Sequence, residues 1–247
     1  VQRSIRWIAA KLESGQRMME CRIRPMARGQ AFRTDAKADM GTVSIGGWET
    51  AFTQDPAEAR WFAVELTEAN TPWLRCRGEP YQVISSLELL ATLYAVKVFW
   101  PEDDCHGDLM TSTGTAITDN LGNSYVVGKL MTTKFPLCAL LMELAEQLGS
   151  RGSWLRLQWA SRDQNQEADA LTNGDYHQFR PENRIAVDPG AMGWTLLDEF
   201  LEAGGAMTDE LTRLRAEKKA LREKMKMVKR RRKKRLAEDT LKVRHPW

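Results

Sequence analysis

The sequence predicts a mixed α/β fold, in which a five-stranded sheet is flanked by helices and followed by a basic C-terminal helix. Three observations support this prediction. Three strand-like segments come first, within residues 31–66. Helical and strand-like segments then alternate between residues 83 and 171, an order typical of α/β domains. Finally, residues 208–247 are rich in lysine and arginine.

The first three strands are expected at residues 31–35, 42–48 and 60–66, where apolar and β-branched residues recur between turn-forming ones. Met40-Gly41 suits the turn of a hairpin between the first two strands. A proline-containing loop precedes the third strand, which then completes an antiparallel meander. The basic sequence before these strands opens with an expected helix, whose apolar face consists of Ile5, Ile8, Ala9 and Leu12.

The strongest helical pattern covers residues 83–100, with Ser85 or Ser86 as its N-cap and Pro101 as its end. A loop is expected at residues 102–114, followed by a strand at 115–118. Two helices follow at 124–130 and 136–148, then a strand at 154–159 and a last helix at 164–171. The tryptophans fall mostly within predicted strands and helices, so we interpret them as core residues.

The chain therefore divides into a connecting segment (residues 1–30) and a folded domain (31–175). An irregular extension (176–207) and a basic helical tail (208–247) follow. The extension contains a short amphipathic helix at 194–201, which Gly204-Gly205 ends. Thr208 is the expected N-cap of the tail helix. The first residue is Val1 rather than Met, which suits a piece of a polyprotein and a trimmed chain equally.

The net charge of +3 conceals a strong asymmetry. From Leu211 onward, sixteen lysines and arginines stand against four acidic residues, so this part carries +12. The remaining residues contain 20 basic and 29 acidic side chains and carry −9. An acidic body with a basic tail predicts that the tail attracts a polyanion such as a nucleic acid.

The four cysteines are scattered, without CxxC spacing, which indicates a reduced, intracellular protein. Cys105-His106 has no second pair at ligand spacing, so zinc is not expected. We recognise neither a signal peptide nor an apolar run of the roughly 18 residues that a membrane span needs, so membrane association is not expected.

Four acidic residues stand in distinctive local settings: Asp35 in FRTDAKAD, Glu88 in ISSLELLATLYAV, Asp119 in AITDNLGNSYVV and Asp169 in NQEADALTN. Three of them are flanked by apolar sequence, where an unpaired carboxylate is costly. Converging carboxylates suit hard divalent cations such as Mg²⁺. Two such ions about 3.5–4 Å apart can cleave a phosphodiester. The pattern therefore indicates a two-ion site for phosphoryl chemistry.

Three of the acids also have simpler interpretations. Asp35 can be a turn aspartate, Glu88 can lie on the solvent face of its helix, and Asp119 can be an N-cap. Paired glycines follow Asp35 in Ile45-Gly46-Gly47-Trp48 and favour a functional role, because they let another backbone approach closely. Asp119 directly follows a strand, and α/β sheets present ligands at strand ends.

Asn165 lies four residues before Asp169, so both share one face of the expected last helix. Asn165 can orient a substrate or cap this helix. Taken alone, Asp169 and its neighbours are a moderate indication of a site. As the fourth member of the set, Asp169 strengthens the prediction.

The order and settings of the four acids resemble the ribonuclease H family, in particular the domain that follows reverse transcriptase in retroelements. The resemblance rests on TDA followed by GGW, on SSLELLA, on TDN and on NQEADAL, which matches Asn-x-x-Ala-Asp-x-Leu. It covers roughly residues 31–175 and excludes the tail. It implies a sheet with antiparallel strands first and parallel strands after the first helix. It also implies an upstream reverse transcriptase as partner.

By this resemblance, Asp35, Glu88 and Asp119 hold one Mg²⁺ ion, and Asp35 and Asp169 hold a second, with Mn²⁺ as an alternative. One ion activates a water and the other stabilises the leaving 3′ oxygen. The implied substrate is the RNA strand of an RNA–DNA hybrid, read by its 2′-hydroxyls and groove shape. Asn120 and Asn165 are the substrate-contacting candidates in the domain.

The sequence departs from many family members, which carry a histidine in a loop before the last helix. Residues 159–164 contain none, which predicts slower turnover. Other metal nucleases fit less well. DEDD exonucleases place a glutamate two residues after the first aspartate, where this chain has Lys37. Integrases and transposases place their glutamate last, whereas here Glu88 is second.

Seven consecutive basic residues in the tail are predicted to contact nucleic acid or to direct nuclear import: Lys229, Arg230, Arg231, Arg232, Lys233, Lys234 and Arg235. The simpler interpretation is a solvated charge run. Residues 208–228 can alternatively form a short coiled coil, because they carry a heptad pattern that Lys218 interrupts. Its apolar positions are Leu211, Leu214, Leu221, Met225 and Val228.

Three functions remain open at this point. The first is a ribonuclease H-like endonuclease from a retroelement polyprotein. The second is a catalytically inactive ribonuclease H fold that binds nucleic acid through its basic tail. The third is a metal-dependent DNA nuclease on the same fold, which only the choice of substrate would distinguish.

Overall fold

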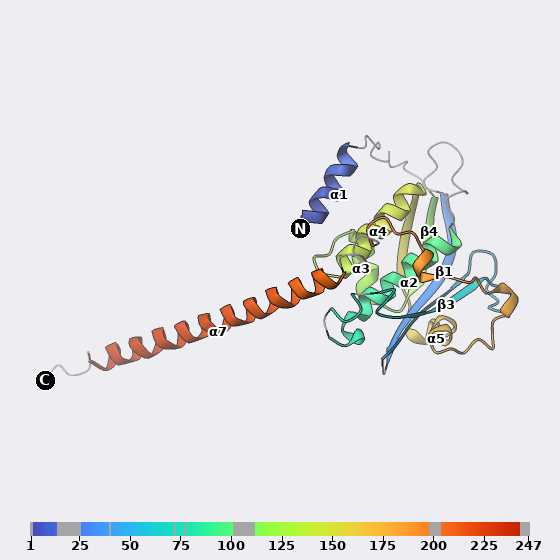
Figure 1. The fold of residues 1–247 in the computed structure, drawn as a ribbon. Coiled ribbons are helices and arrows are strands. Elements are labelled where there is room, and N and C mark those ends of the chain that lie inside the picture. Colours follow the sequence, from blue (N-terminus) through green and yellow to red (C-terminus); the bar gives the residue numbers. More distant parts are fainter. Residues whose placement is uncertain are drawn as a thin grey trace.

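The computed structural model of the 247-residue chain describes residues 2–13, 26–39, 41–71, 73–76, 78–100, 112–197 and 204–242. One sheet is formed by Met26–Asp39 (β1), Thr42–Glu49 (β2), Trp61–Leu66 (β3), Ser112–Thr118 (β4) and Ser153–Trp159 (β5). The helices are Gln2–Glu13 (α1), Ile84–Phe99 (α2), Leu121–Lys129 (α3), Leu137–Ser150 (α4), Gln166–Thr172 (α5) and Gly204–Lys242 (α7). The sheet and its helices form one body, from which α7 projects (Figure 1).

The strands are ordered β3-β2-β1-β4-β5. β2 is antiparallel to β1 and to β3, whereas β4 is parallel to β1 and to β5. The first three strands therefore form the expected meander. Parallel neighbours need crossover connections, and α2 supplies the first while α3 and α4 supply the second. This confirms the predicted mixed five-stranded sheet.

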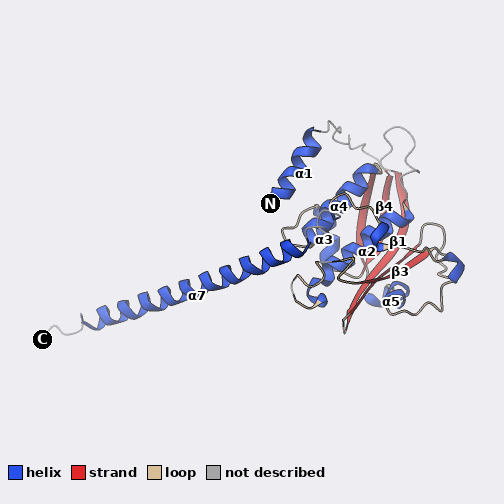
Figure 2. Ribbon diagram, viewed as in Figure 1, coloured by secondary structure: helices blue, strands red, loops and turns tan. Residues whose placement is uncertain are grey.

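Alternation along the strands separates two hydrophobic clusters onto opposite faces of the sheet. In β3, Phe62 packs into the larger cluster, which includes Leu90 of α2 and Leu140 of α4. Its neighbour Trp61 packs into the smaller cluster with Leu171 of α5. The sheet therefore lies between α2 and α4 on one face and α5 on the other, as the layers of Figure 2 show.

Several element boundaries differ from the predicted ones. β1 starts at Met26, inside the segment predicted as a connection, and continues to Asp39 because its ladder with β2 extends that far. β4 starts at Ser112 rather than at residue 115, since Ser112 and Thr113 pair with β5. Residues 101–111 and 14–25 lie outside the described residues, so the predicted stop at Pro101 and the pair Cys105-His106 are not placed.

The prediction that Ser85 or Ser86 caps α2 is wrong. A 3₁₀ helix, Pro80–Val83, runs directly into α2, so both serines lie inside its first turn and Val83 stands at the N-cap. The combined stretch Pro80–Phe99 is long and apolar enough to cross a membrane by composition, but 72% of its apolar window is buried inside the protein. Its length and apolarity are those of a core helix.

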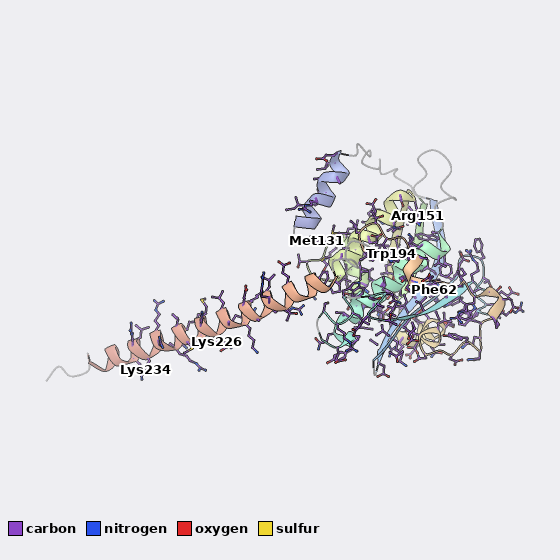
Figure 3. The ribbon with its side chains drawn as sticks, in the orientation of Figure 1. Phe62, Met131, Arg151, Trp194, Lys226 and Lys234 are labelled. Atoms are coloured by element: carbon purple, nitrogen blue, oxygen red, sulfur yellow. The ribbon has the colours of Figure 1, made fainter. Side chains whose placement is uncertain are left out.

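The extension after α5 packs against the body instead of leaving it. Its amides on Thr195, Leu196 and Leu197 donate to the carboxylate of Glu143 in α4, at 3.2, 2.6 and 3.3 Å. Trp194 is buried in the larger cluster, where its ring centroid lies 5.3 Å from that of Tyr94 in α2, and Figure 3 shows it within the body. The amphipathic helix predicted at 194–201 falls mostly on residues 198–203, outside the described residues.

The interpretation of the tryptophans as core residues is correct for most described ones and wrong for two. Trp154 and Trp159 on β5 are 44% and 50% exposed. β5 ends the sheet, so its outer face is only partly covered. Trp48, Trp61, Trp73, Trp100 and Trp194 are buried.

The tail forms the predicted basic helix, but α7 starts at Gly204, so Thr208 lies within it and is not its N-cap. Gly204-Gly205, predicted as a break, instead begins the helix, a position where glycine is tolerated. Arg215 anchors α7 to the body by donating to the carbonyl of Cys76 at 2.6 Å. Beyond this contact the helix projects away, with Lys226 and Lys234 distant from the body (Figure 3).

Gly114 provides a test of the packing between β4 and α2. A Cβ at this position would lie 2.1 Å from the Trp100 ring, which contacts Phe32 on β1. We expect Gly114→Ala to lower the free energy of unfolding by about 1–3 kcal/mol, as overpacking does. Gly128→Ala is the control, because its Cβ meets nothing within 4 Å, and it should stabilise α3 by about 0.5–1 kcal/mol. Urea unfolding measures both, and equal effects would contradict this packing.

Candidate metal centre

The carboxylates gather where β1 and β4 separate. The chain leaves β1 toward β2, whereas β4 and β5 lie on the other side of β1, so the connections diverge at this point. The last β1–β4 pair is Arg33 with Ile117, and β4 ends at Thr118. Asp35, two residues beyond this pair on β1, and Asp119, directly after β4, therefore lie where the parallel pairing of these strands ends. This is where open α/β sheets bind ligands.

Three of the four predicted acids converge at this point. Asp35, Glu88 and Asp119 each offer a carboxylate oxygen within 4.8 Å of the others. Asp35 is 1% exposed and Glu88 is 4% exposed, so the turn and solvent-face interpretations are wrong for these two. Asp35 lies within β1, opposite Gly46, rather than at the end of a strand as predicted. The N-cap of α3 is Asn120, which excludes that role for Asp119.

Close backbone packing brings α5 to this site. A Cβ on Gly46 would lie 2.8 Å from the Cβ of Leu171, so only glycine lets β2 approach α5 this closely. Gly47 is similarly tight against Phe62 and Thr34. The paired glycines thus serve the close approach that their sequence predicted. The consequence is that α5, which carries Asp169, lies against the strand pair that carries Asp35.

Burial and mutual repulsion destabilise the charged forms of the two innermost acids. Burial is the main cause that raises the pKa of Asp35 from 3.8 to about 6, and the charges of Asp119 and Asp169 add to it. A hydrogen bond from Thr172 opposes this shift. Burial, followed by the charges of Asp35 and Asp119, raises the pKa of Glu88 well above its ordinary value. The site is thus short of positive charge.

Asp169 lies beside the three converging acids and is more exposed than they are. Its charge acts on Asp35, which shows its proximity, but it is not part of the group of three. Asn173 donates to its Oδ2 at 2.8 Å, and Lys37 in turn donates to Asn173 Oδ1 at 2.8 Å. One carboxylate oxygen of Asp169 is therefore held by an amide.

Thr172 is a site residue that the sequence interpretation missed. Its hydroxyl lies 2.8 Å from Asp35 Oδ2 and 2.9 Å from the carbonyl of Asp169, one turn earlier in α5. The hydroxyl thereby fixes the rotamer of Asp35 relative to the helix that carries Asp169. Spacing alone could have suggested it, since Thr172 follows Asp169 by three residues and shares its helical face.

The two predicted substrate-contacting amides are bonded within the protein. Asn120 accepts from the amide of Asn123 at 3.1 Å and donates to the hydroxyl of Ser85 at 3.2 Å, linking α3 to α2. Asn165 is buried, and its Nδ2 donates to the carbonyl of Thr34 at 3.1 Å. It stands at the N-cap of α5 but makes no side-chain cap bond. Its contact ties α5 to β1 next to Asp35.

Two residues at the rim of the site were also missed. Arg162 lies in the 3₁₀ helix Arg162–Gln164, and its Nε is 3.5 Å from Asp119 Oδ2 and 3.6 Å from Asp169 Oδ1. Trp159 donates through its indole to the carbonyl of Asp119 at 2.9 Å and leaves half of its surface exposed. Both belong to the stretch of residues 159–164, which contains no histidine.

The donor set suits a hard divalent cation. Among the described residues, Asp35 Oδ1 and Glu88 Oε2 are buried and make no hydrogen bond with the protein. Unpaired buried carboxylate oxygens are costly unless a cation or donor satisfies them. All the acids at the site offer oxygen ligands, which Mg²⁺ and Mn²⁺ prefer over the softer metals' nitrogen and sulfur.

The predicted substrate-binding residues of the tail lie on α7, far in sequence from the carboxylates. Lys229, Arg230, Arg231, Arg232, Lys233, Lys234 and Arg235 are all exposed within the helix. α7 carries them away from the sheet (Figure 1).

No family model and no curated protein matches the chain. Solved structures of RNase H1 proteins do match it in a structural comparison. One is from the halophilic archaeon Halobacterium salinarum, with 14% identity over 60% of this chain and 96% of that chain and a TM-score of 0.41. Another is an RNase H1 in complex with an RNA/DNA hybrid, with 18% identity over 58% and 93% and a TM-score of 0.42.

A third is the N-terminal RNase H domain of a Mycobacterium tuberculosis protein, solved as a fusion with maltose-binding protein. It has 16% identity over 60% of this chain and 92% of that chain, with a TM-score of 0.40. With the order β3-β2-β1-β4-β5, an antiparallel β2, α2 after the meander and α5 on the opposite face, the chain has a ribonuclease H-like fold.

Proposed function

We propose that this protein is an endonuclease that uses Mg²⁺ or Mn²⁺ to hydrolyse the RNA strand of RNA–DNA hybrids. The observation that carries the proposal is the convergence of Asp35, Glu88 and Asp119 within 4.8 Å at the point where β1 and β4 separate. Two of these carboxylates are buried in apolar surroundings, where they lower stability without a cation. Buried carboxylates that repel one another are characteristic of reacting sites.

The residues have distinct roles in this proposal. Asp35, Glu88 and Asp119 would hold one ion, and Asp35 and Asp169 would hold the second. When bound there, the ions would activate a water and stabilise the leaving 3′ oxygen. Thr172 orients Asp35 through its hydroxyl, and Asn173 orients Asp169. Asn165 keeps α5 against β1, so that the carboxylates from strand and helix keep their spacing.

The choice of an RNA–DNA hybrid follows from the resemblance of four sequence segments to the ribonuclease H family. The exposed basic run of α7 supports a polyanionic substrate, because seven adjacent cations on one helix attract phosphates. Trp159 presents an exposed aromatic surface beside Asp119, which suits contact with a sugar or base. Derivation from a retroelement polyprotein with an upstream reverse transcriptase remains a prediction.

The proposal is tested with a labelled RNA–DNA hybrid, Mg²⁺ and the Asp119→Asn variant. We expect the parent protein to cleave only the RNA strand of the hybrid, and duplex DNA and duplex RNA to stay intact. Asp119→Asn should reduce the rate by about 10²-fold or more, because a ligand charge is lost. EDTA should stop the reaction. Asp163→Asn, the same change on an exposed aspartate of the neighbouring loop, is the control and should retain activity.

Other outcomes identify the alternatives. Binding of the hybrid without cleavage in Mg²⁺ and Mn²⁺ would indicate the inactive fold that binds through its tail. Cleavage of duplex DNA would indicate a DNA nuclease on the same fold. Equal loss in Asp119→Asn and Asp163→Asn would place the reacting site elsewhere.

A further inference from the structure

Arg162 is held in a loop that both strand ends anchor. The amide of Ala160 donates to the carbonyl of Thr118 on β4 at 3.0 Å. On the other side of the loop, Asn165 donates to the carbonyl of Thr34 on β1, and Arg33 donates to the carbonyl of Gln164. The backbone of Arg162 is therefore fixed relative to the carboxylates, although its side chain is 70% exposed.

The guanidinium group of Arg162 links one acid of the converging group with one acid outside it. Asp119 belongs to the converging group of three, whereas Asp169 stands outside it on α5. Arg162 Nε lies 3.5 Å from Asp119 Oδ2 and 3.6 Å from Asp169 Oδ1. At these separations the attraction is ionic rather than a short, directed hydrogen bond. Such a partly exposed pair contributes about 1 kcal/mol or less, so another cation can displace it.

The two oxygens of Asp169 are held differently. Its Oδ2 accepts a hydrogen bond from Asn173, while its Oδ1 is the oxygen nearest Arg162. A divalent ion that coordinates Asp169 needs an oxygen at about 2.0–2.1 Å for Mg²⁺. The guanidinium would then lie within a few ångströms of that ion, and two like charges this close repel each other.

We propose that Arg162 is a positioning residue that competes with a divalent ion for Asp169 and thereby sets the ion concentration at which the second position fills. This inference rests on the proposed function, since it assigns a control to the same site. The group of Asp35, Glu88 and Asp119 binds its ion more tightly than the second position does, because it places three acids within 4.8 Å of one another. Only Asp119 among these three contacts Arg162. Arg162 opposes the ion at Asp169 more strongly, because it contacts one of the two carboxylates assigned to that ion but only one of three in the other position.

Arg75 offers a matched control elsewhere on the body. Its guanidinium also links two acids, Glu68 and Glu79, with Nη1 3.3 Å from Glu79 Oε2, and it is likewise partly exposed. Neither glutamate belongs to the converging carboxylates. Arg75→Ala therefore removes the same charge and the same type of bridge without touching the site.

The experiment measures ion binding by calorimetry on the whole chain without nucleic acid, using Mg²⁺ and Mn²⁺ separately. We expect Arg162→Ala to bind the weaker ion about three- to tenfold more tightly, because one opposing charge is removed. Arg162→Lys keeps the charge and should stay close to the parent protein. Arg75→Ala should not change either affinity. Half-maximal cleavage should shift to lower Mg²⁺ in the Arg162→Ala variant by the same factor.

Each result decides between the inference and the function on which it rests. Unchanged ion affinity in Arg162→Ala would overturn the competition and leave the metal centre intact. Weaker binding in this variant would also overturn it, since Arg162 would then help to build the site. No ion binding in any of the variants would overturn the proposed metal centre itself, and the competition with it.

Discussion

Asp35→Asn is expected to abolish hydrolysis and, at the same time, to make the protein more stable. The loss should reach about 10³-fold, because Asp35 is the one carboxylate assigned to both ions and ion-mediated stabilisation amounts to several kcal/mol. Asparagine preserves the shape of the side chain and can still accept the bond from Thr172. The variant therefore removes a charge with little disturbance of the packing.

The gain in stability follows from the raised pKa of Asp35. Its folded pKa of about 6 lies above the ordinary 3.8, so between these values the folded protein binds more protons than the unfolded chain. Stability then falls as the pH rises through this range, and the full cost of the charge applies above about pH 6. That cost is of the order of 3 kcal/mol. Asp35→Asn should remove much of it, so the gain should be small near pH 4 and largest above pH 6.

Urea unfolding in EDTA, from pH 4 to pH 8, measures this difference. Asp39→Asn is the matched control, because it makes the same change on the same strand at an exposed position and should alter neither activity nor stability by much. A variant that loses activity but is also less stable above pH 6 would contradict the account of a strained, buried carboxylate. Retained activity would remove Asp35 from the reacting site.

Removal of residues 208–247 is expected to weaken hybrid binding by about 10- to 100-fold near 100 mM salt. The basic run covers about two turns of a helix, so roughly three or four of its seven cations can face one duplex at a time. Each phosphate contact contributes close to one unit to the slope of log affinity against log salt. The slope should therefore become shallower by about 3. Cleavage of saturating hybrid should change little, because the carboxylates remain.

Two substitutions in the full chain separate charge from packing. Replacing Arg230, Arg231, Lys233 and Lys234 with glutamine should reproduce most of the effect while keeping α7 helical. Replacing the exposed apolar residues Leu221, Met225 and Val228 with glutamine keeps the charge and removes the heptad pattern. If the second variant alone lost hybrid affinity and self-association by sedimentation, the tail would act as a coiled coil. Fluorescence anisotropy with the labelled hybrid measures the affinities.

Much of the architecture follows from local sequence. β2, β3 and β5 lie within a residue of their predicted positions, because alternation and flanking turns define strands that are buried on at least one face. The four acids were identified from their short local settings, and three of them converge as predicted. The boundaries of β1, β4 and α7 were predicted less well. Their ends depend on partners distant in the chain, as the pairing of Ser112 with Ser153 shows.

By itself, the sequence determined the order of the elements, the identity of the acids and the basic character of the tail, since each is expressed in the spacing and type of neighbouring residues. Only the tertiary structure decided which atoms meet. Thr172 contacts Asp35, Arg162 links Asp119 to Asp169, and Asn165 turns to the carbonyl of Thr34 instead of outward. These contacts join segments more than a hundred residues apart or place a loop over a strand end. The contact of Thr172 with Asp35 depends on the close approach of α5 to β2 at Gly46, a consequence of packing that local patterns do not contain.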